Sequence, residues 1–247
     1  MRWMFLLLAV PITVLSQDIN LLEPLRLVDT PSAGTLKKGS FRARIDIYPE
    51  GGILGGIDAG ITDRFMFGIS YGGTNIVGIG RINWNDEPGV SVRYRLFEED
   101  YFLPAILIGY DSQGFGADID STKRYINKSP GIFAAASKNF LFLGTLGFHG
   151  GLNYSFERGD GDKDINIFAG VEKSINPELT LVGEYDFAFN DNGPNSVGSG
   201  LGYLNAGLKW VFAGKLEISF ILKDILVNRK DVQSMAREIR IAYAEIF

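Results

Sequence analysis

Residues 204–223 read LNAGLKWVFAGKLEISFILK. Apolar side chains alternate with small, polar or charged ones on both sides of a short turn, Ala213-Gly214. Strict alternation is the pattern of a β-strand with one apolar face, and a strand of about nine to eleven residues crosses a bilayer at a tilt of ~45°. The stretch therefore predicts two antiparallel strands of membrane-crossing length, joined as a hairpin.

The same alternation recurs along the chain from residue 41 onward. It predicts twelve strands, in residues 41–48, 53–61, 65–72, 90–96, 102–111, 131–138, 142–156, 164–172, 179–187, 204–212, 216–223 and 238–247. The fifth run is nearly all apolar and the sixth is composed of small residues, so the alternation is weakest there.

The connections between these strands alternate in length. Short ones at 62–64, 98–101, 139–141, 174–178 and 213–214 take turns with long polar ones, most clearly at 74–88, 112–130, 190–200 and 225–236. Short periplasmic turns and long extracellular loops are typical of outer-membrane barrels. A soluble barrel or sandwich would not place charged and glycine-rich residues on the inner face. We therefore predict an all-β protein, a closed antiparallel transmembrane β-barrel of about twelve strands in the outer membrane of a Gram-negative cell.

The composition excludes several kinds of chemistry. The 247 residues contain no cysteine and one histidine, His149, and the formal net charge is -5. Without cysteine there are no disulfides, cysteine metal sites or thiol nucleophiles, and one histidine leaves little scope for metal or acid–base chemistry. An acidic chain is a poor partner for nucleic acid. We expect no catalytic residue, cofactor, metal or nucleic-acid partner.

The first forty residues have a different character from the barrel. Arg2 followed by an apolar stretch up to Leu15 indicates a signal peptide, residues 1–16, cleaved after Ser16. Residues 17–40 are expected to form a periplasmic lead-in or partial plug, and 41–247 the barrel. The lead-in has apolar residues suited to packing beneath the barrel, namely Leu21, Leu22, Leu25, Leu27 and Val28.

The side chains of opposite parity to the apolar face are predicted to line the lumen. They are Arg42, Arg44, Asp46, Asp58, Arg93, Arg95, His149, Asp164, Glu172, Glu184, Asp186, Lys209, Glu217, Lys223, Glu238 and Arg240. Their charges nearly cancel, which implies no strong ion selectivity. The eighth and ninth strands contribute only acids and the fourth only bases, so an acidic wall is expected partly to face a basic one.

Two motifs invite sharper interpretations that the residues do not support. Asp160, Asp162 and Asp164 have the spacing that begins a calcium loop, but Ile165 and Val171 stand where the loop needs Gly and Glu. We expect a solvated hairpin tip there. His149 is the single candidate base for an outer-membrane hydrolase, and its glycine neighbours favour a lumen filler.

The C-terminus resembles the signal that the barrel assembly machinery reads in outer-membrane proteins. Alternate apolar or aromatic residues lead to a terminal Phe, as Ile239, Ile241, Tyr243 and Phe247. Glu245 departs from the pattern and is expected on the lipid face near the periplasmic headgroups, where a charge costs roughly 0 to 1 kcal/mol.

Several segments, covering about half of the mature chain, are similar to the YjbH-like barrel proteins associated with exopolysaccharide production. They are Ala33-Gly34-Thr35-Leu36, Gly39-Ser40-Phe41, Gly60-Ile61-Thr62-Asp63-Arg64, Pro88-Gly89, Tyr94-Arg95-Leu96 with Glu98-Glu99, Leu103-Pro104-Ala105-Ile106, Asp111-Ser112-Gln113-Gly114-Phe115-Gly116, Ala136-Ser137-Lys138 and Asp186-Phe187-Ala188. The resemblance implies an accessory envelope role, with polysaccharide-export components as partners, and transfers no catalytic residue.

The sequence thus predicts a non-enzymatic barrel in contact with outer-membrane lipid and lipopolysaccharide. It acts either as a narrow passive channel or as an accessory of exopolysaccharide export. The alternative is a closed structural or adhesive barrel that acts through its extracellular loops, and an outer-membrane hydrolase is a more distant alternative.

Overall fold

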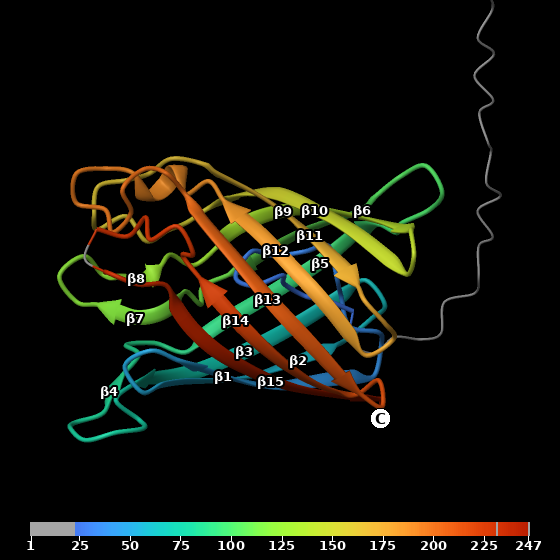
Figure 1. Ribbon diagram of the computed structural model, residues 1–247, viewed down its shortest axis with the longest axis horizontal. Coiled ribbons are helices and arrows are strands. Elements are labelled where there is room, and N and C mark those ends of the chain that lie inside the picture. The colour runs from blue at the N-terminus through green and yellow to red at the C-terminus, as the bar shows by residue number, and fades with distance from the viewer. Residues whose placement is uncertain (1–22, 231, 247) are drawn as a thin grey trace, which may run out of the picture.

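The computed structural model describes residues 23–230 and 232–246 and shows a closed antiparallel barrel (Figure 1). In these residues the wall consists of twelve strands: β1 (Ser40–Tyr48), β2 (Gly52–Gly60), β3 (Phe65–Thr74), β5 (Gly89–Phe97), β6 (Ala105–Asp111), β9 (Gly131–Leu141), β10 (Thr145–Tyr154), β11 (Asn166–Ser174), β12 (Leu179–Asp186), β13 (Tyr203–Phe212), β14 (Leu216–Lys223) and β15 (Ala236–Ile246). Each strand pairs with its neighbours in chain order, and β1 closes the ring by pairing with β15. The predicted twelve-strand barrel is confirmed.

Among the described residues, four short elements lie outside the wall. The two-residue strand β4 (Asn83–Trp84) pairs antiparallel with the end of β3, and β7 (Phe115–Ile119) forms a separate hairpin with β8 (Arg124–Asn127). A 3-10 turn, η1 (Phe189–Asp191), lies between β12 and β13. All four belong to long loops, which gather at the left end of Figure 1, whereas the short turns and the C-terminus lie at the right end. In outer-membrane barrels the long loops are extracellular and the short turns periplasmic, and the two ends are named accordingly below.

Some strands begin later than predicted because the residues expected to start them belong to a turn. The fifth predicted run was expected from Phe102, but β6 begins at Ala105. The carboxylate of Asp100 accepts hydrogen bonds from the backbone N–H groups of Phe102 and Leu103 and holds them in a turn. The seventh run likewise begins at Thr145 rather than Phe142, after a turn in which Leu143 and Gly144 adopt positive φ.

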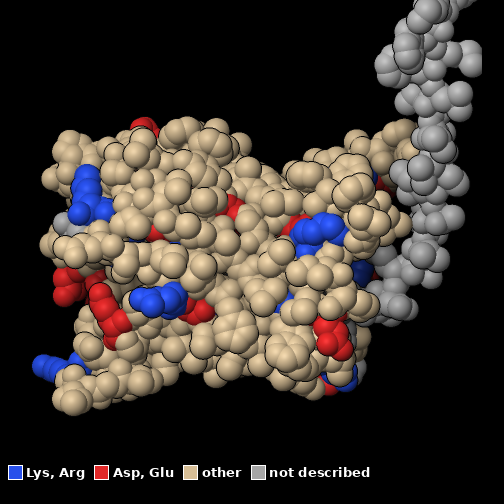
Figure 2. Space-filling model, in the orientation of Figure 1, with Lys and Arg blue, Asp and Glu red and all other residues tan. Residues whose placement is uncertain are grey.

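The outer face of the wall is apolar, as the alternation requires. On β15 the side chains of Ile239, Ile241 and Tyr243 are exposed, whereas Glu238 and Arg240 between them are buried. Figure 2 views the wall formed by β12 to β15 and shows a largely uncharged surface with charged residues toward the two ends. An apolar belt of this kind is the surface that lipid covers. Within the described residues, no helix has the length and apolar character needed to cross a membrane.

The carboxylate of Glu245, which the sequence placed on the lipid face, is paired at the end of the last strand. Glu245 points outward and accepts hydrogen bonds from Lys215 at 2.7 Å and from the hydroxyl of Tyr243 at 2.6 Å. Both partners lie at the periplasmic end of the wall. Phe247, the last residue of the predicted assembly signal, lies outside the described residues, as do the predicted signal peptide and Leu21 and Leu22.

Candidate functional site: the lumen and its plug

Fifteen of the sixteen predicted lumen residues lie in barrel strands with their side chains directed inward. Arg44, Glu172 and Asp186 are half-buried, and the other twelve are buried. Asp164 is the exception, and its assignment to the lumen was wrong. It precedes β11, is exposed, and donates its backbone N–H to the carboxylate of Asp162. The loop turn that begins at Asp160 continues through Asp164, so the strand starts only at Asn166.

The wall charges pair locally instead of forming an acidic wall opposite a basic one. Asp46 on β1 contacts Arg240 on β15 and Arg44 on its own strand, and Arg44 also pairs with Asp58 at 2.9 Å. On the next part of the wall Lys209 pairs with Glu172 at 2.9 Å. The expected transverse field is therefore replaced by local ion pairs, which join charges within one strand, on adjacent strands or, for Lys209 and Glu172, on strands two apart.

Residues 23–36, the plug, fill the centre of the barrel. The plug is a tight hairpin: the backbone N–H of Ser32 donates to the carbonyl of Leu25, and that of Leu27 donates to the carbonyl of Thr30. Gly34 allows the close return of the chain, because a Cβ at this position would lie 2.1 Å from the carbonyl oxygen of Pro24. Leu25, Leu27 and Val28 thus pack inside the barrel, whereas the sequence suggested that they pack beneath it.

The tip of the plug is bound by one carboxylate of the wall. Glu184 accepts hydrogen bonds from the backbone N–H groups of Val28, Asp29 and Thr30, at 2.9 to 3.1 Å, and from the hydroxyl of Thr30 at 2.8 Å. The side-chain amide of Asn205 donates a further bond to it at 2.8 Å. One buried carboxylate therefore accepts hydrogen bonds from all three consecutive backbone N–H groups at the tip of the plug.

The carbonyl oxygens of the plug are bound by wall arginines. Arg93 donates to Leu25, Arg240 to Val28 and Arg95 to Ala33, at 2.5, 2.8 and 3.1 Å.

Charged side chains of the plug complete the network. Arg26 pairs with Asp46 at 2.6 Å, Glu23 with Arg95 at 2.6 Å, and Asp29 with Lys223 at 2.8 Å. These three plug residues were not identified from the sequence as partners of the lumen.

Apolar contacts hold the plug on its remaining sides. They form three clusters, each shared with inward residues of the wall: Leu25 and Leu36 with Met66; Leu27 and Val28 with Val182 and Ile221; and Ala33 with Ala105, Leu107, Phe133, Ala135 and Phe168. The inward apolar residues of β6 and β9 were missed because these strands carry apolar or small residues on both faces. The leucines of the lead-in were the sequence signal that apolar partners exist for them in the barrel.

An extracellular loop reaches the plug from the other side. The β7–β8 hairpin belongs to the loop between β6 and β9, and Phe115 at its start is buried. The guanidinium of Arg26 lies 4.8 Å from the centre of this ring and the amine of Lys223 lies 5.1 Å from it. The side-chain amide of Asn127 donates to the carboxylate of Asp29 at 2.8 Å. The plug is therefore in contact with both the wall and an extracellular loop.

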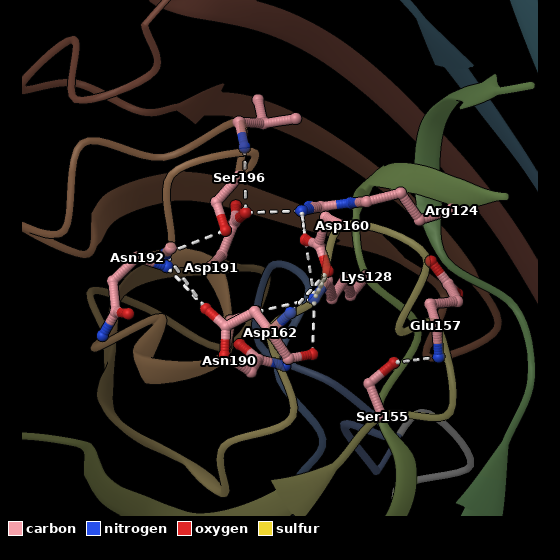
Figure 3. A network of polar contacts seen from close by, with 12 residues as sticks. Arg124, Lys128, Ser155, Glu157, Asp160, Asp162, Asn190, Asp191, Asn192 and Ser196 are labelled. Carbon is pink, nitrogen blue, oxygen red and sulfur yellow. Dashed lines mark hydrogen bonds and ion pairs between the residues drawn. The ribbon is translucent and has the colours of Figure 1, made fainter. Parts of the chain in front are cut away.

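A buried ion network closes the extracellular rim (Figure 3). Arg124 on β8 pairs with Asp160 at 2.6 Å and with Asp191 at 2.5 Å, and Lys128 pairs with Asp160 at 2.8 Å. Asp162 accepts the backbone N–H groups of Asn192 and Gly193. The expectation of a solvated tip was wrong for Asp160 and Asp162, because loops distant in sequence fold over them.

Two small cavities lie at the mouth of the filled lumen. One of about 50 Å³ is lined by Phe115, Lys223 and Glu238, and one of about 40 Å³ by Asp29, Asn166 and Asp186. A water molecule needs ~10 to 15 Å³ of such volume, so each cavity is too small for a solute larger than a few waters. A much larger hollow, about 900 Å³, opens on the outer face of the wall.

His149 contacts the plug indirectly. The hydroxyl of Ser137 lies 2.8 Å from its Nδ1, and the same hydroxyl oxygen accepts the backbone N–H of Ala33 at 2.9 Å. Nε2 lies 3.9 Å from Glu172. The pair of Ser137 and His149 is covered by the plug, and its geometry supports a role in holding Ala33.

The searches of protein-family models and of curated proteins gave no match. Solved structures do match. A KdgM porin shares 10% sequence identity over 84% of this chain and 99% of that chain, with a TM-score of 0.53. A KdgM porin in complex with disordered oligogalacturonate gives 11% identity, the same coverage and a TM-score of 0.51. At this identity the likeness shows the fold, and both proteins compared are porins. In fold this chain is therefore a Gram-negative outer-membrane β-barrel of twelve strands, with a lumen that its own N-terminal segment fills.

Proposed function

We propose that the protein is a passive outer-membrane channel whose passage is closed here by the plug. The observation that carries this proposal is that the wall binds the plug through charged side chains, Glu184, Arg93, Arg95 and Arg240, rather than through a continuous apolar core. Barrels of about eight strands are filled by their own side chains, and wider ones enclose a channel or a plugged lumen. A twelve-strand wall lined with charges becomes a wet passage when the plug withdraws.

The solute class follows from the groups that the plug now occupies. Arg93, Arg95 and Arg240 bind carbonyl oxygens of an extended segment, and a withdrawn plug would leave them free for an oxygen-rich, acidic solute. One of the similar porins holds an oligogalacturonate, an acidic oligosaccharide. We propose small acidic or polar oligosaccharides as solutes, and the resemblance to YjbH-like proteins connects such a role with exopolysaccharide production.

A disulfide lock tests the proposal. The chain has no cysteine, and the 2.9 Å contact between the amide nitrogen of Ala33 and the hydroxyl of Ser137 brings the two residues within disulfide reach. Ala33→Cys with Ser137→Cys is expected to be non-conducting in planar bilayers when oxidised and to conduct after reduction, with anions favoured. Each single-cysteine variant serves as the control and should not respond to the reductant.

A variant lacking residues 23–36 completes the test, with its folding checked by faster migration of the unheated sample in gels. A folded barrel without the plug that carries no current would overturn the channel proposal. It would favour the second candidate, a closed barrel that acts through its extracellular loops, for which the buried rim network of Arg124 provides a specific observation.

A further inference from the structure

A hollow lies on the lipid-facing side of the wall. Its volume of about 900 Å³ is within the ~300 to 1,000 Å³ range of small-ligand sites, and it extends over β11 to β15 and onto the end of β1. It is an open groove lined almost entirely by apolar groups. Most of its lining residues are outward ones that make no contact with the plug, and the substitutions proposed below change only such residues, so this inference is independent of the channel proposal.

Strand register explains why the wall is hollow at this place. One outward row crosses five strands as Val171, Gly183, Ala206, Leu222 and Arg237, each paired with the next. The neighbouring row carries the large side chains of Leu181, Leu208, Phe220 and Ile239. Gly183 and Ala206 are adjacent and small, so they leave a hollow in the outer surface. The hollow is bounded by Val171 and Leu222 along the same row and by the large side chains of the neighbouring row.

A cation stands at one end of the groove. Arg237 is exposed and begins the outward face of β15, immediately after the extracellular loop. Among the described residues its side chain makes no hydrogen bond or ion pair. Lys173, at the periplasmic end, already donates to the carbonyl oxygens of Leu143 and Ser174. Within the part of the chain that the structure describes, the groove therefore has an unpaired guanidinium at its extracellular end, whereas the amine at its periplasmic end is already engaged.

We propose that this groove binds a phosphate-bearing lipid of the outer leaflet, lipopolysaccharide, through its lipid A portion. An acyl chain lies over Gly183 and Ala206, and Arg237 binds a lipid A phosphate, for which a guanidinium provides paired donors. Two features of the wall select this occupant. The groove is continuous with the apolar belt that lipid already covers, and its charge is complementary to an anionic headgroup at extracellular height.

Two pairs of matched variants test the site. A Cβ at Gly183 would meet only Val171 Cγ1, at 3.7 Å, so a side chain can leave the backbone there without a clash, and Gly183→Leu is expected to fill the groove. Gly55 on β2 also points outward, and a Cβ there would meet only the carbonyl oxygen of Tyr71, at 3.7 Å, so Gly55→Leu is the control outside the groove. Arg237→Ala is matched by Arg81→Ala, another exposed arginine of the extracellular side.

The measurement is the binding of lipid A to the delipidated, folded protein in detergent, followed by native mass spectrometry. We expect wild type, Gly55→Leu and Arg81→Ala to bind lipid A alike, and Gly183→Leu and Arg237→Ala to bind it at least tenfold more weakly. Phosphatidylethanolamine should not compete. Equal binding by all five proteins would overturn the site, as would competition by phosphatidylethanolamine. A lipid-free dimer of the wild type that becomes monomeric in Gly183→Leu would also overturn it and would identify the groove as a contact between two copies.

Discussion

At the scale of single residues, Glu184 is the most consequential side chain of the lumen. It is 1% exposed, and it connects the wall to three consecutive amides of the plug. Carboxylates that accept several hydrogen bonds are strong anchors because each bond is charge-assisted. No other side chain among the described residues binds the plug tip through as many backbone amides, so Glu184 is the main anchor of the tip.

Replacing Glu184 by Gln should therefore loosen the plug while leaving the barrel folded. A neutral amide cannot accept all of these bonds, and the loss of about 1 to 3 kcal/mol corresponds to roughly 5- to 150-fold more molecules with the plug displaced. Single-channel recordings should show a higher open probability. Asp186→Asn is the matched control, because Asp186 bonds to Asn166 and to the amide of Ala188 instead of the plug. Equal open probabilities in the two variants would contradict the role of Glu184 as the anchor.

At the scale of elements, the β7–β8 hairpin and the plug are the two parts that meet inside the mouth. They lie about a hundred residues apart in the chain, as the bond between Asn127 and Asp29 shows. Phe115 adds a ring between two cations, and such cation–π contacts contribute about 0.5 to 2 kcal/mol each. Displacement of the loop from outside and displacement of the plug from inside are thus energetically linked.

Phe115→Ala should consequently raise the open probability, although the substitution lies outside the plug. We expect a smaller effect than that of Glu184→Gln, because the wall contacts remain. Bilayer recordings of the full chain measure it, and Ile119→Ala at the far end of β7 provides a control on the same hairpin. If Phe115→Ala conducts no more than Ile119→Ala, the hairpin does not support the plug.

The rim network should keep the extracellular loops folded over the mouth of the barrel. Removing one partner of a buried ion pair costs about 3 to 5 kcal/mol, because the remaining charge is left uncompensated. Arg124→Met leaves Asp160 and Asp191 without their shared cation, so proteases added outside should cleave the loops around 155–165 and 187–202. The barrel itself should keep its heat-dependent gel mobility. Lys123→Met, at the exposed neighbouring position, should remain resistant, and equal cleavage of both variants would refute the prediction.

The same network predicts a pH dependence. Burial alone raises the pKa of Asp160, but the hydrogen bond from Lys128 and the charges of Lys128 and Arg124 outweigh it and hold the pKa below its ordinary value. A carboxylate with a lowered pKa stabilises the folded loops above its ordinary pKa and loses this contribution as the pH falls through the lowered value. Protease resistance of the loops should therefore persist from neutral pH to about pH 4 and decline only below it. A decline already between pH 7 and pH 5 would exclude Asp160 as the cause.

At the scale of the whole molecule, every wall strand pairs on both edges, so the barrel exposes no strand edge for other chains to extend. Closure also makes unfolding cooperative, since opening one seam exposes backbone groups of two strands. The plug adds apolar and ionic contacts to most of the circumference, from β1 round to β15. The fold is therefore stabilised both by the hydrogen bonds of the closed sheet and by the contacts of the plug with the inside of the wall.

A closed barrel of this kind should fractionate with the outer membrane and migrate faster in gels when it has not been boiled. The reason is that the hydrogen-bonded ring resists unfolding by detergent at room temperature. Membrane fractionation and paired heated and unheated samples measure both properties. Recovery of the protein in a detergent-free periplasmic extract would contradict the membrane architecture.

The sequence by itself determined the strands and their faces. Alternation and strand length are properties of neighbouring residues, so Leu204 to Phe212 could be assigned to a strand, and Lys209 to its inner side, without knowledge of any partner. Parity also placed Arg42, Glu184 and Arg240 inside the barrel. It failed for Asp164, where a loop turn ends the periodic pattern.

The tertiary structure alone decided which groups meet. Glu184 is 154 to 156 residues distant from the plug amides that it binds, and Asp160 and Asp191 reach Arg124 only because three loops fold over the mouth. The hollow at Gly183 and Ala206 likewise depends on the register of β12 and β13. Periodicity fixes the side of the wall on which a residue lies, but hydrogen bonds and ion pairs act over a few ångströms, and only the folded chain determines which distant residues come that close.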